Sequence, residues 1–330
     1  MSIIVSPMST GNGAYVVHKS LEAGINDYRV ISYSPYLTLI PFLLYVKGRC
    51  SKADLIHTAP DYGLFHSRRG KPLVLTFHNY VLDRFMRDYS SLLQNIHYRT
   101  DLRWFIKKSV ERAKVITAVS YFTADLVGRE LGISSPIKVI YNGVDQKRFC
   151  PNRQSRESDN KVNVLFCGNL SVRKGVQWLL PILNNLAPNI HVYYTAGLRN
   201  KSNLPKRDRI HCLGRIKHEE MHNVYNDMDI LLFPTVREGF GLAAAEAMAC
   251  GLPVVATDCS SLPELIDSGK GGYLCPLGDV NFFAEKINLL ADNISLRREF
   301  GEYNRAKVEE LFTLERMVND YKNLFEEILS

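Results

Sequence analysis

The sequence has no long apolar run. Its most apolar window, Leu37–Val46, spans ten residues and is interrupted by Thr38 and Pro41, whereas a membrane-spanning helix needs about 20 apolar residues. No basic segment followed by an apolar segment and a cleavage site opens the sequence, so we expect no signal peptide. We therefore expect a cytoplasmic protein that is soluble or lies peripherally on the cytoplasmic face of a membrane.

Paired cysteines are also missing. The seven cysteines are scattered, and no two of them form a Cys-x-x-Cys pair. An odd number of cysteines, several of them in apolar runs, indicates reduced and buried thiols rather than a disulfide framework. Their spacing does not suit a zinc site either. We expect neither a metal ion nor another bound cofactor.

Length and charge indicate a large chain with an anionic partner. At 330 residues the chain is long for one core and comfortable for two domains. Its net charge of +7 suits a phosphate ligand, an anionic membrane or a nucleic acid without choosing between them. Residues 151–160 contain no large apolar side chain, which is typical of a linker. We expect domains over residues 1–150 and 151–310, with a last helix over 311–330.

Short apolar runs alternate with helical patterns along the first half, which predicts a parallel sheet covered by helices. The expected strands are Ile3–Ser6, Arg29–Ser32, Leu55–His57, Leu73–Phe77, Val115–Val119 and Ile137–Tyr141. Ligands of such sheets bind at the carboxyl ends of the strands. His57, His78 with Asn79, and Ser120 fall at such ends, and we interpret His57 as structural.

Residues 229–257 carry the strongest chemical signal. An apolar strand, Ile230–Phe233, is ended by Pro234, and a helix over Leu242–Cys250 precedes a second strand, Val254–Thr257. Free amides at the start of that helix, over 241–244, form a site suited to phosphate.

Two glutamates flank this predicted phosphate site. Glu238 lies in the loop before the helix and Glu246 about one turn inside it. Carboxylates beside a phosphate site can accept hydrogen bonds from sugar hydroxyls, so we interpret the stretch as a nucleotide-sugar site. The alternative is an alanine-rich core helix with two solvated glutamates.

The same stretch resembles the donor-site signature of the retaining family-4 glycosyltransferases of GT-B fold, also called glycosyl transferases group 1. Proline, Glu-Gly-Phe-Gly, a second Glu and Ala-Met-Ala-x-Gly-x-Pro-Val all match. The resemblance implies an α/β protein of two Rossmann-like domains, whose parallel sheets face each other across a cleft. It implies that Glu238 holds the transferred sugar and that Glu246 binds the ribose, with Phe240, Gly241, Leu242 and Ala243 also at the donor.

Further motifs in the first half resemble this family. Thr-Phe-His-Asn places His78 beside the transferred sugar, although the family usually has Asp where this chain has Asn79. The glycine loop with Gly11 and Gly13 resembles the family's loop that faces donor and acceptor. Taken alone, Gly-x-Gly is equally compatible with an ordinary turn.

The second half opens with a strand over Val162–Cys167 and then a cationic loop. Gly168, Asn169, Arg173 and Lys174 belong to a run in which the family has cations that bind the diphosphate; Asn169 stands where the family commonly has Arg. We expect Lys174, with Arg173, to stabilise the leaving group. The resemblance further places Ile216 beside the nucleobase.

Residues 80–108 are basic and aromatic. A helix with Tyr98, Leu102, Phe105 and Ile106 on one face could lie at a membrane interface or pack on its own domain. A lipid-linked or other glycan acceptor is one hypothesis for this segment.

Three functions remain open. The favoured one is a retaining, metal-independent transfer of a hexose from a UDP- or GDP-sugar, in cell-surface polysaccharide or glycolipid synthesis. The alternatives are a nucleotide-sugar epimerase or hydrolase of GT-B fold, and a non-catalytic basic binding protein. Nucleic acid is not an expected partner, because the basic residues are spread over both halves.

Overall fold

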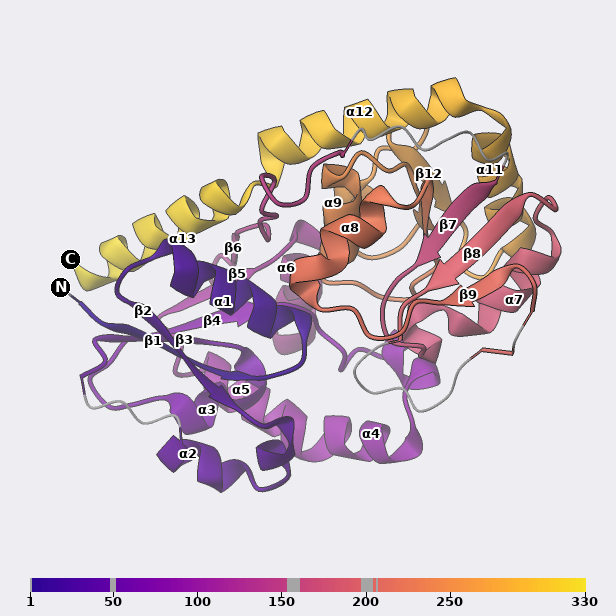
Figure 1. Ribbon diagram of the computed structural model, residues 1–330. Helices are drawn as coiled ribbons and strands as arrows, with labels where there is room; N and C mark the ends of the chain where they lie inside the picture. The colour runs from indigo at the N-terminus through magenta and orange to yellow at the C-terminus, as the bar shows by residue number, and fades with distance from the viewer. Residues whose placement is uncertain (1, 48–51, 153–160, 197–203, 206) are drawn as a thin grey trace. The chain divides into compact units, whose positions relative to one another are not determined.

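The computed structural model describes residues 2–47, 52–152, 161–196, 204–205 and 207–330. The chain divides into two compact units (Figure 1). The first contains residues up to Gly143 together with Leu314–Ser330, and the second contains Val144–Thr313. Each unit is described by itself below.

The first unit is built on a six-stranded sheet of order β2-β1-β3-β4-β5-β6. Every pair of neighbouring strands is parallel, as the alternation of strands and helices predicts. The strands are β1 Ile4–Ser9, β2 Tyr28–Tyr33, β3 Leu55–Thr58, β4 Leu73–Phe77, β5 Val115–Ala118 and β6 Lys138–Val139.

Helices of the first unit come from both ends of its sequence. They are α1 Gly13–Gly24, α2 Leu44–Lys47, α3 Gly63–His66, α4 Leu92–His97, α5 Arg103–Val110, α6 Tyr121–Leu131 and α13 Leu314–Leu329, with short helical turns η1 Pro35–Leu39, η2 Pro41–Leu43, η3 Pro60–Tyr62, η4 Phe85–Tyr89 and η5 Tyr98–Leu102. Helix α13 contacts α1, and the two lie side by side in Figure 1. A Cβ atom on Gly24 would lie 2.6 Å from a methyl carbon of Val318, so this contact is close.

The second unit has a sheet of the same kind, of order β12-β11-β10-β7-β8-β9. Its strands are β7 Val162–Phe166, β8 Ile190–Tyr194, β9 Ile210–Cys212, β10 Ile230–Phe233, β11 Val254–Thr257 and β12 Gly272–Cys275. Its helices are η6 Val172–Lys174, α7 Val176–Asn184, η7 His218–Glu220, α8 Met221–Asn226, α9 Leu242–Ala249, α10 Leu262–Leu265, α11 Val280–Asp292 and α12 Ile294–Leu311. All five strand pairings are parallel.

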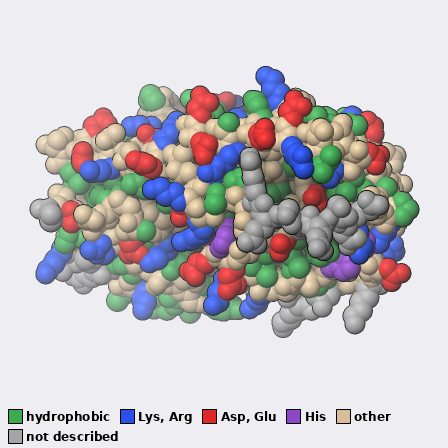
Figure 2. Space-filling model, turned by 45° about the horizontal axis from the view of Figure 1, so that its top comes forward, with side chains coloured by type: hydrophobic (Ala, Val, Ile, Leu, Met, Phe, Trp, Pro, Cys, Tyr) green, Lys and Arg blue, Asp and Glu red, His purple; other side chains and the backbone are tan. Residues whose placement is uncertain are grey.

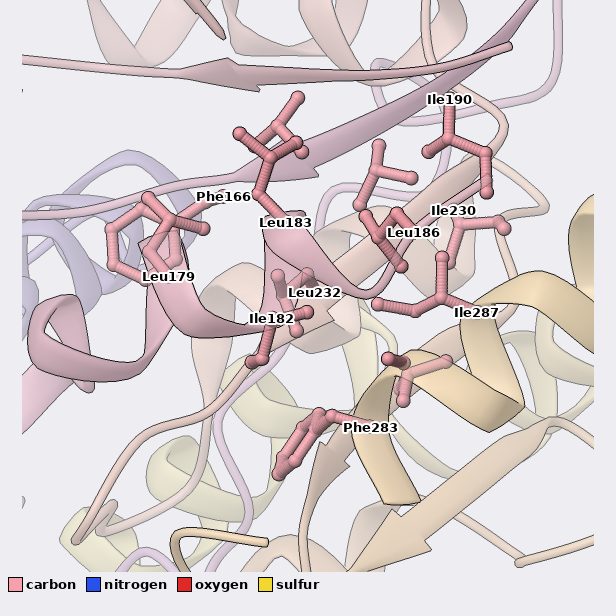
Figure 3. Packing of buried hydrophobic residues seen from close by; sticks show 14 of the residues in the cluster. Phe166, Leu179, Ile182, Leu183, Leu186, Ile190, Ile230, Leu232, Phe283 and Ile287 are labelled. Atoms are coloured by element: carbon pink, nitrogen blue, oxygen red, sulfur yellow. The ribbon is translucent and has the colours of Figure 1, made fainter. Parts of the chain in front are cut away.

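The core of the second unit lies between one face of this sheet and helices α7 and α11. Figure 3 shows Leu179 of α7 next to Phe166 of β7, and Phe283 and Ile287 of α11 in the same cluster, all of them almost fully buried. Apolar side chains at these helical spacings face the strands, and the β7–β10 pair thereby holds its carboxyl-terminal loops on a rigid base.

The unit boundaries differ from those expected from composition. The segment after Asn142-Gly143 belongs to the second unit, because Val144 forms a bridge with Thr313 and the buried Phe149 packs its ring against His218. The last helix, α13, starts at Leu314 and belongs to the first unit. Most of the expected linker, residues 153–160, lies outside the described residues.

Of the strands predicted for the first half, only Leu73–Phe77 has the predicted ends, and β1 and β6 differ most from the prediction. Strand β1 continues through Pro7 to Ser9 and pairs with β2 along this whole length; the carbonyl of Pro7 also accepts a hydrogen bond from Thr58 Oγ1. The strand expected over 137–141 is reduced to Lys138–Val139.

Residues 80–108 do not form one continuous helix. A capping box at Ser91 starts α4, and α5 follows η5. Leu102 and Ile106 are buried in the core of the first unit, so the expected apolar face packs on its own domain. Trp104 is 53% exposed.

Charged side chains of both signs are interspersed on the surface. On the face shown in Figure 2, Lys and Arg side chains lie among Asp and Glu side chains. In the described part of the chain, no helix combines the length and apolar character needed to cross a membrane.

Candidate functional site

A close backbone contact fixes the cationic loop of the second unit. Gly175 has φ of +80°, and a Cβ atom there would lie 2.0 Å from the carbonyl oxygen of Pro234. Only glycine meets both conditions. The contact continues through Arg173, whose carbonyl oxygen accepts hydrogen bonds from the amide of Val236 and the hydroxyl of Thr235. The loop after β7 is thereby joined to the loop after β10.

This junction brings Lys174 and Glu238 together. Lys174 Nζ lies 2.5 Å from Glu238 Oε1, and the two side chains are 19% and 14% exposed. Thr235 Oγ1 donates to the same oxygen at 2.8 Å. Burial raises the pKa of Glu238, but the positive charges of Lys174 and Arg173 outweigh burial and the net pKa is lowered. Glu238 is therefore ionised at neutral pH.

The second carboxylate oxygen of Glu238 is unused. Within the described residues, Oε1 takes both side-chain hydrogen bonds and Oε2 takes none. The Glu238 backbone is also fixed, because its amide donates to Ser260 Oγ and its carbonyl accepts from Ser261 Oγ. Ser260 has φ of +52°, a conformation that side chains rarely adopt and that is common near functional sites. Oε2 is thus a rigidly placed acceptor.

Helix α9 begins directly after this loop, and its N-cap residue, Gly241, has φ of +95°. No side chain caps this helix start. The expectation of free amides over 241–244 was wrong for Ala244, because its amide donates to the carbonyl of Gly241. The described residues supply no acceptor for the amides of Leu242 and Ala243. These two donors remain available to an anion.

Glu246 is held by two partners that sequence reasoning missed. His218 Nε2 lies 2.6 Å from Glu246 Oε1, and the hydroxyl of Tyr225 donates to Oε2 at 3.1 Å. Glu246 is 4% exposed. Hydrogen bonding to Glu246 raises the pKa of His218 against the opposing effect of burial. The alternative of two solvated glutamates is therefore excluded for Glu246, which is a buried and oriented carboxylate.

One histidine pattern bears on the expected absence of a metal. Residues 218–222 read His-Glu-x-x-His, a pattern that binds zinc on some helices. Here His218 Nε2 contacts Glu246, and His222 Nδ1 contacts the carbonyl oxygen of Glu219. Throughout the described residues, no group of three or more His, Cys, Asp or Glu could hold a metal ion. Of the two histidines in the pattern, His218 is the one that contacts Glu246.

The remaining expected donor residues lie near the carboxyl ends of the strands. Gly168 has φ of +123°, and its amide donates to Thr195 Oγ1 at the end of β8. Asn169 follows it and accepts a hydrogen bond from the amide of Ser171 through its carbonyl. Ile216 is half-buried. Phe240 is buried and packs its ring against Phe312.

In the first unit, the glycine loop caps helix α1. Gly11 has φ of +81°, and Asn12 Oδ1 accepts a hydrogen bond from the amide of Tyr15. Gly13 opens the helix, with no atom close to the position of a Cβ. The loop thus has the conformation expected of a strand-to-helix turn.

His78 lies at the end of β4 but is not oriented by its neighbour Asn79. Asn79 Oδ1 accepts a hydrogen bond from the amide of Tyr80. The contact of His78 is with another histidine: its Nε2 lies 3.0 Å from His18 Nε2. His78 Nδ1 is buried without a partner among the described residues. Burial lowers the pKa of His78 to about 4, so the ring is neutral at pH 7.

Family models match both halves of the chain. The family model described as Glycosyltransferase Family 4 matches residues 4–148, and that described as Glycosyl transferases group 1 matches residues 161–293. N-acetyl-alpha-D-glucosaminyl L-malate synthase of Bacillus anthracis is 24% identical to this chain over 93% of it and 84% of the relative.

Solved structures show the same fold. Sucrose-phosphate synthase of Thermosynechococcus elongatus covers 99% of both chains, with a TM-score of 0.82 and 19% identity. Anabaena HepE in complex with UDP and glucose covers 99% of this chain and 100% of its own, with a TM-score of 0.80 and 18% identity. The predicted α/β architecture of GT-B type is therefore confirmed, and the chain belongs to the glycosyltransferases of family 4, glycosyl transferases group 1.

Proposed function

We propose that this glycosyltransferase is a retaining, metal-independent enzyme that moves a hexose from a UDP- or GDP-sugar to a glycan or lipid-linked acceptor. The observation that carries the proposal is the arrangement after β10. There an ionised Glu238 with one unused oxygen, the ammonium of Lys174 and the free amides of Leu242 and Ala243 belong to one short segment and the loop joined to it.

The donor diphosphate is assigned to the cationic side of this arrangement. An ammonium group has three protons, and Glu238 takes one of those of Lys174. The other protons, the charge of Arg173 and the two amides of α9 can stabilise the negative charge that develops as the glycosidic bond breaks. Such fixed positive groups supply the charge stabilisation for which other transferases use a divalent metal.

The two carboxylates are assigned to the two sugars of the donor. Glu238 Oε2 accepts from hydroxyls of the transferred hexose and so orients it. Glu246 accepts from the ribose hydroxyls, since each carboxylate oxygen has two lone pairs and His218 and Tyr225 occupy one on each oxygen. Ile216 lines the nucleobase position, and the loops of Gly168 and of Gly11–Gly13 allow close approach of the backbone.

Retention follows from an acceptor that attacks on the face of the leaving group. A phosphate oxygen of the departing diphosphate then takes the acceptor proton, and no separate base is required. His78, neutral at pH 7, donates to or accepts from a sugar hydroxyl. Structural relatives support this donor class, since HepE is described in complex with UDP-glucose.

We further propose that the first unit meets its acceptor at an anionic membrane on the cytoplasmic side, in cell-surface polysaccharide or glycolipid synthesis. Large apolar side chains are exposed from η1 through α2: Tyr36 at 79%, Leu39 at 79%, Phe42 at 76% and Val46 at 71%. Arg68 lies over the ring of Tyr45 in this segment. Aromatic and basic side chains together suit the interface of an anionic bilayer.

The donor assignment is tested by a panel of nucleotide sugars, using thermal shift and then turnover. We expect one UDP- or GDP-hexose to raise the melting temperature and to be consumed only with an acceptor, and the product anomer, read by NMR, to match the donor. Consumption of donor alone would favour a hydrolase or epimerase. Salt-sensitive binding of DNA without any donor binding would favour a basic binding protein.

The membrane assignment is tested by co-sedimentation with vesicles of anionic and of neutral lipids. Phe42→Glu and Trp104→Glu should each reduce sedimentation with anionic vesicles, because a carboxylate replaces an exposed aromatic ring. Ile294→Glu in the second unit is the matched control, since Ile294 is 55% exposed. Equal sedimentation of all variants would contradict the proposal.

A further inference from the structure

A chain of buried hydrogen bonds crosses the first unit behind His78. It joins three histidines from distant parts of the sequence: His18 on α1, His57 on β3 and His78 after β4. His18 and His57 have no exposed surface, and their rings stack with centroids 4.4 Å apart. The proposed transfer uses neither of these two rings, so their placement needs another explanation.

The contacts are short and continuous. His78 Nε2 lies 3.0 Å from His18 Nε2. His18 Nδ1 lies 2.7 Å from both Tyr28 Oη and Ser6 Oγ. Tyr28 Oη lies 2.7 Å from His57 Nδ1. Both ring nitrogens of His18 therefore have hydrogen-bond partners: Nε2 contacts His78, and Nδ1 contacts hydroxyl groups.

The far end of the chain is closed by hydroxyl groups. His57 Nε2 lies 2.7 Å from Thr76 Oγ1, which contacts Thr117 Oγ1 at 2.7 Å and the hydroxyl of Tyr321 at 3.1 Å. Tyr321 belongs to α13, and Phe325 of the same helix packs its ring against His57. The members of this hydrogen-bond network are thus imidazole rings and hydroxyl groups, and none of them is a charged side chain.

All three histidines are neutral at pH 7. Burial lowers the pKa values of His18 and His57, as it does that of His78. A neutral imidazole has one N–H donor and one acceptor nitrogen. When two such rings share one hydrogen bond, one ring must donate and the other must accept. The position of the proton on His78 is therefore tied to its position on His18.

We propose that His18 is a positioning residue of this transferase, which holds the imidazole of His78 in one orientation and one neutral tautomer. The unpartnered Nδ1 of His78 then presents a single hydrogen-bonding character to a sugar hydroxyl. The inference rests on the proposed contact between His78 and the sugar. In many enzymes a carboxylate fixes the histidine tautomer; here a second histidine, backed by Tyr28, takes that place.

The first test measures the tautomer directly. In protein with 15N-labelled histidine, long-range proton–nitrogen correlation should show a single neutral tautomer for His78 without donor. In His18→Phe, which keeps a ring but removes both nitrogens, we expect a mixture of both tautomers. His18→Gln retains a polar group able to contact His78 and should restore a single form. An unchanged His78 signal in folded His18→Phe overturns the inference.

The second test measures turnover. We expect His18→Phe to lower kcat about ten-fold, the effect of about one hydrogen bond, with the KM for the donor changed less than about two-fold. Combining it with His78→Phe should add no further loss, because both changes remove one interaction. Tyr28→Phe cuts the chain one step further back and should give a smaller effect.

The matched control is His66→Phe. His66 is a buried histidine of the same unit, and neither of its ring nitrogens has a hydrogen-bond partner among the residues that the structure describes. We expect this variant to keep both turnover and the His78 tautomer. If the double variant His18→Phe/His78→Phe lost clearly more turnover than His78→Phe alone, the positioning role would be contradicted. Full activity of His78→Phe would instead remove His78 from the proposed function, so the two failures are distinguishable.

Discussion

Replacing Lys174 by methionine separates the structural role of the Lys174–Glu238 pair from its role in transfer. Methionine keeps an unbranched apolar side chain and removes the charge. Removal of one partner from a fully buried ion pair costs about 3–5 kcal/mol. Both side chains here retain some exposure, 19% and 14%, and Thr235 still donates to Glu238. We therefore expect the free energy of unfolding to fall by about 2 kcal/mol.

The effect on turnover should be larger and should have a different origin. Lys174 is assigned to the charge that develops on the diphosphate, and a preorganised donor at such a position contributes about 3 kcal/mol or more to the rate. We expect kcat to fall by at least about 100-fold. In the double variant Lys174→Met/Glu238→Gln the buried carboxylate is gone, so stability should recover in part, whereas turnover should not.

The assays are urea unfolding and turnover with a saturating donor. Lys307→Met is the matched control, because Lys307 is 12% exposed and lies 2.9 Å from Asp267 in the same unit; this variant should lose stability while keeping its kcat. If the double variant recovered turnover together with stability, the pair would be structural only and the assignment of Lys174 to the diphosphate would be refuted.

Four further results are expected. Glu246→Ala should weaken nucleotide binding by about 1–3 kcal/mol in calorimetry, as loss of a buried acceptor does; unchanged affinity would remove the ribose role. Because the pKa of His218 is raised by Glu246, its contribution to stability should be complete below about pH 6.5 and lost as pH rises through the raised pKa, a dependence that chemical unfolding should not find in His218→Gln. His78 behaves oppositely: burial lowers its pKa to about 4, so acidification from about pH 7 to 5 should cost the wild type roughly 2 kcal/mol more than His78→Phe in the same assay, and equal losses in the two proteins would contradict its burial. Gly175→Ala should lower the melting temperature and donor affinity together, because its Cβ would lie 2.0 Å from the carbonyl oxygen of Pro234.

Local sequence patterns predicted the elements that depend on local physics. The strand over Ile230–Phe233, its end at Pro234 and the following helix match the structure closely. These features depend on apolar runs, proline and glycine, which act over a few residues. The placement of Glu238 before this helix and of Glu246 inside it was predictable for the same reason.

Contacts between distant residues were not predictable from those patterns. His18 and His78 are 60 residues apart in the sequence, and nothing within α1 marks its histidine as different from a core residue. Tyr225 and His218 converge on Glu246 from another helical segment. Their spacing of seven residues, which places both on one helical face, was the available signal.

The expected domain boundary failed to coincide with that of the structure for a related reason. Composition marks where apolar side chains are scarce, at residues 151–160. The division of the chain is instead set by which sheet a segment joins, and Val144 joins Thr313 across the sequence. Where the polypeptide passes from one unit to the other, the local amino-acid composition does not mark the boundary.

Helix α13 gives the first unit a discontinuous sequence, with consequences for synthesis. Since chains emerge from the ribosome from the amino end and domains generally fold as units, the leading sheet must wait for the final helix, which is made after the entire second unit. Until then Tyr28 and His57 lack the cover that Phe325 and Tyr321 supply. A stop codon near residue 313 would therefore impair the opposite terminus of the polypeptide more than the region beside the cut.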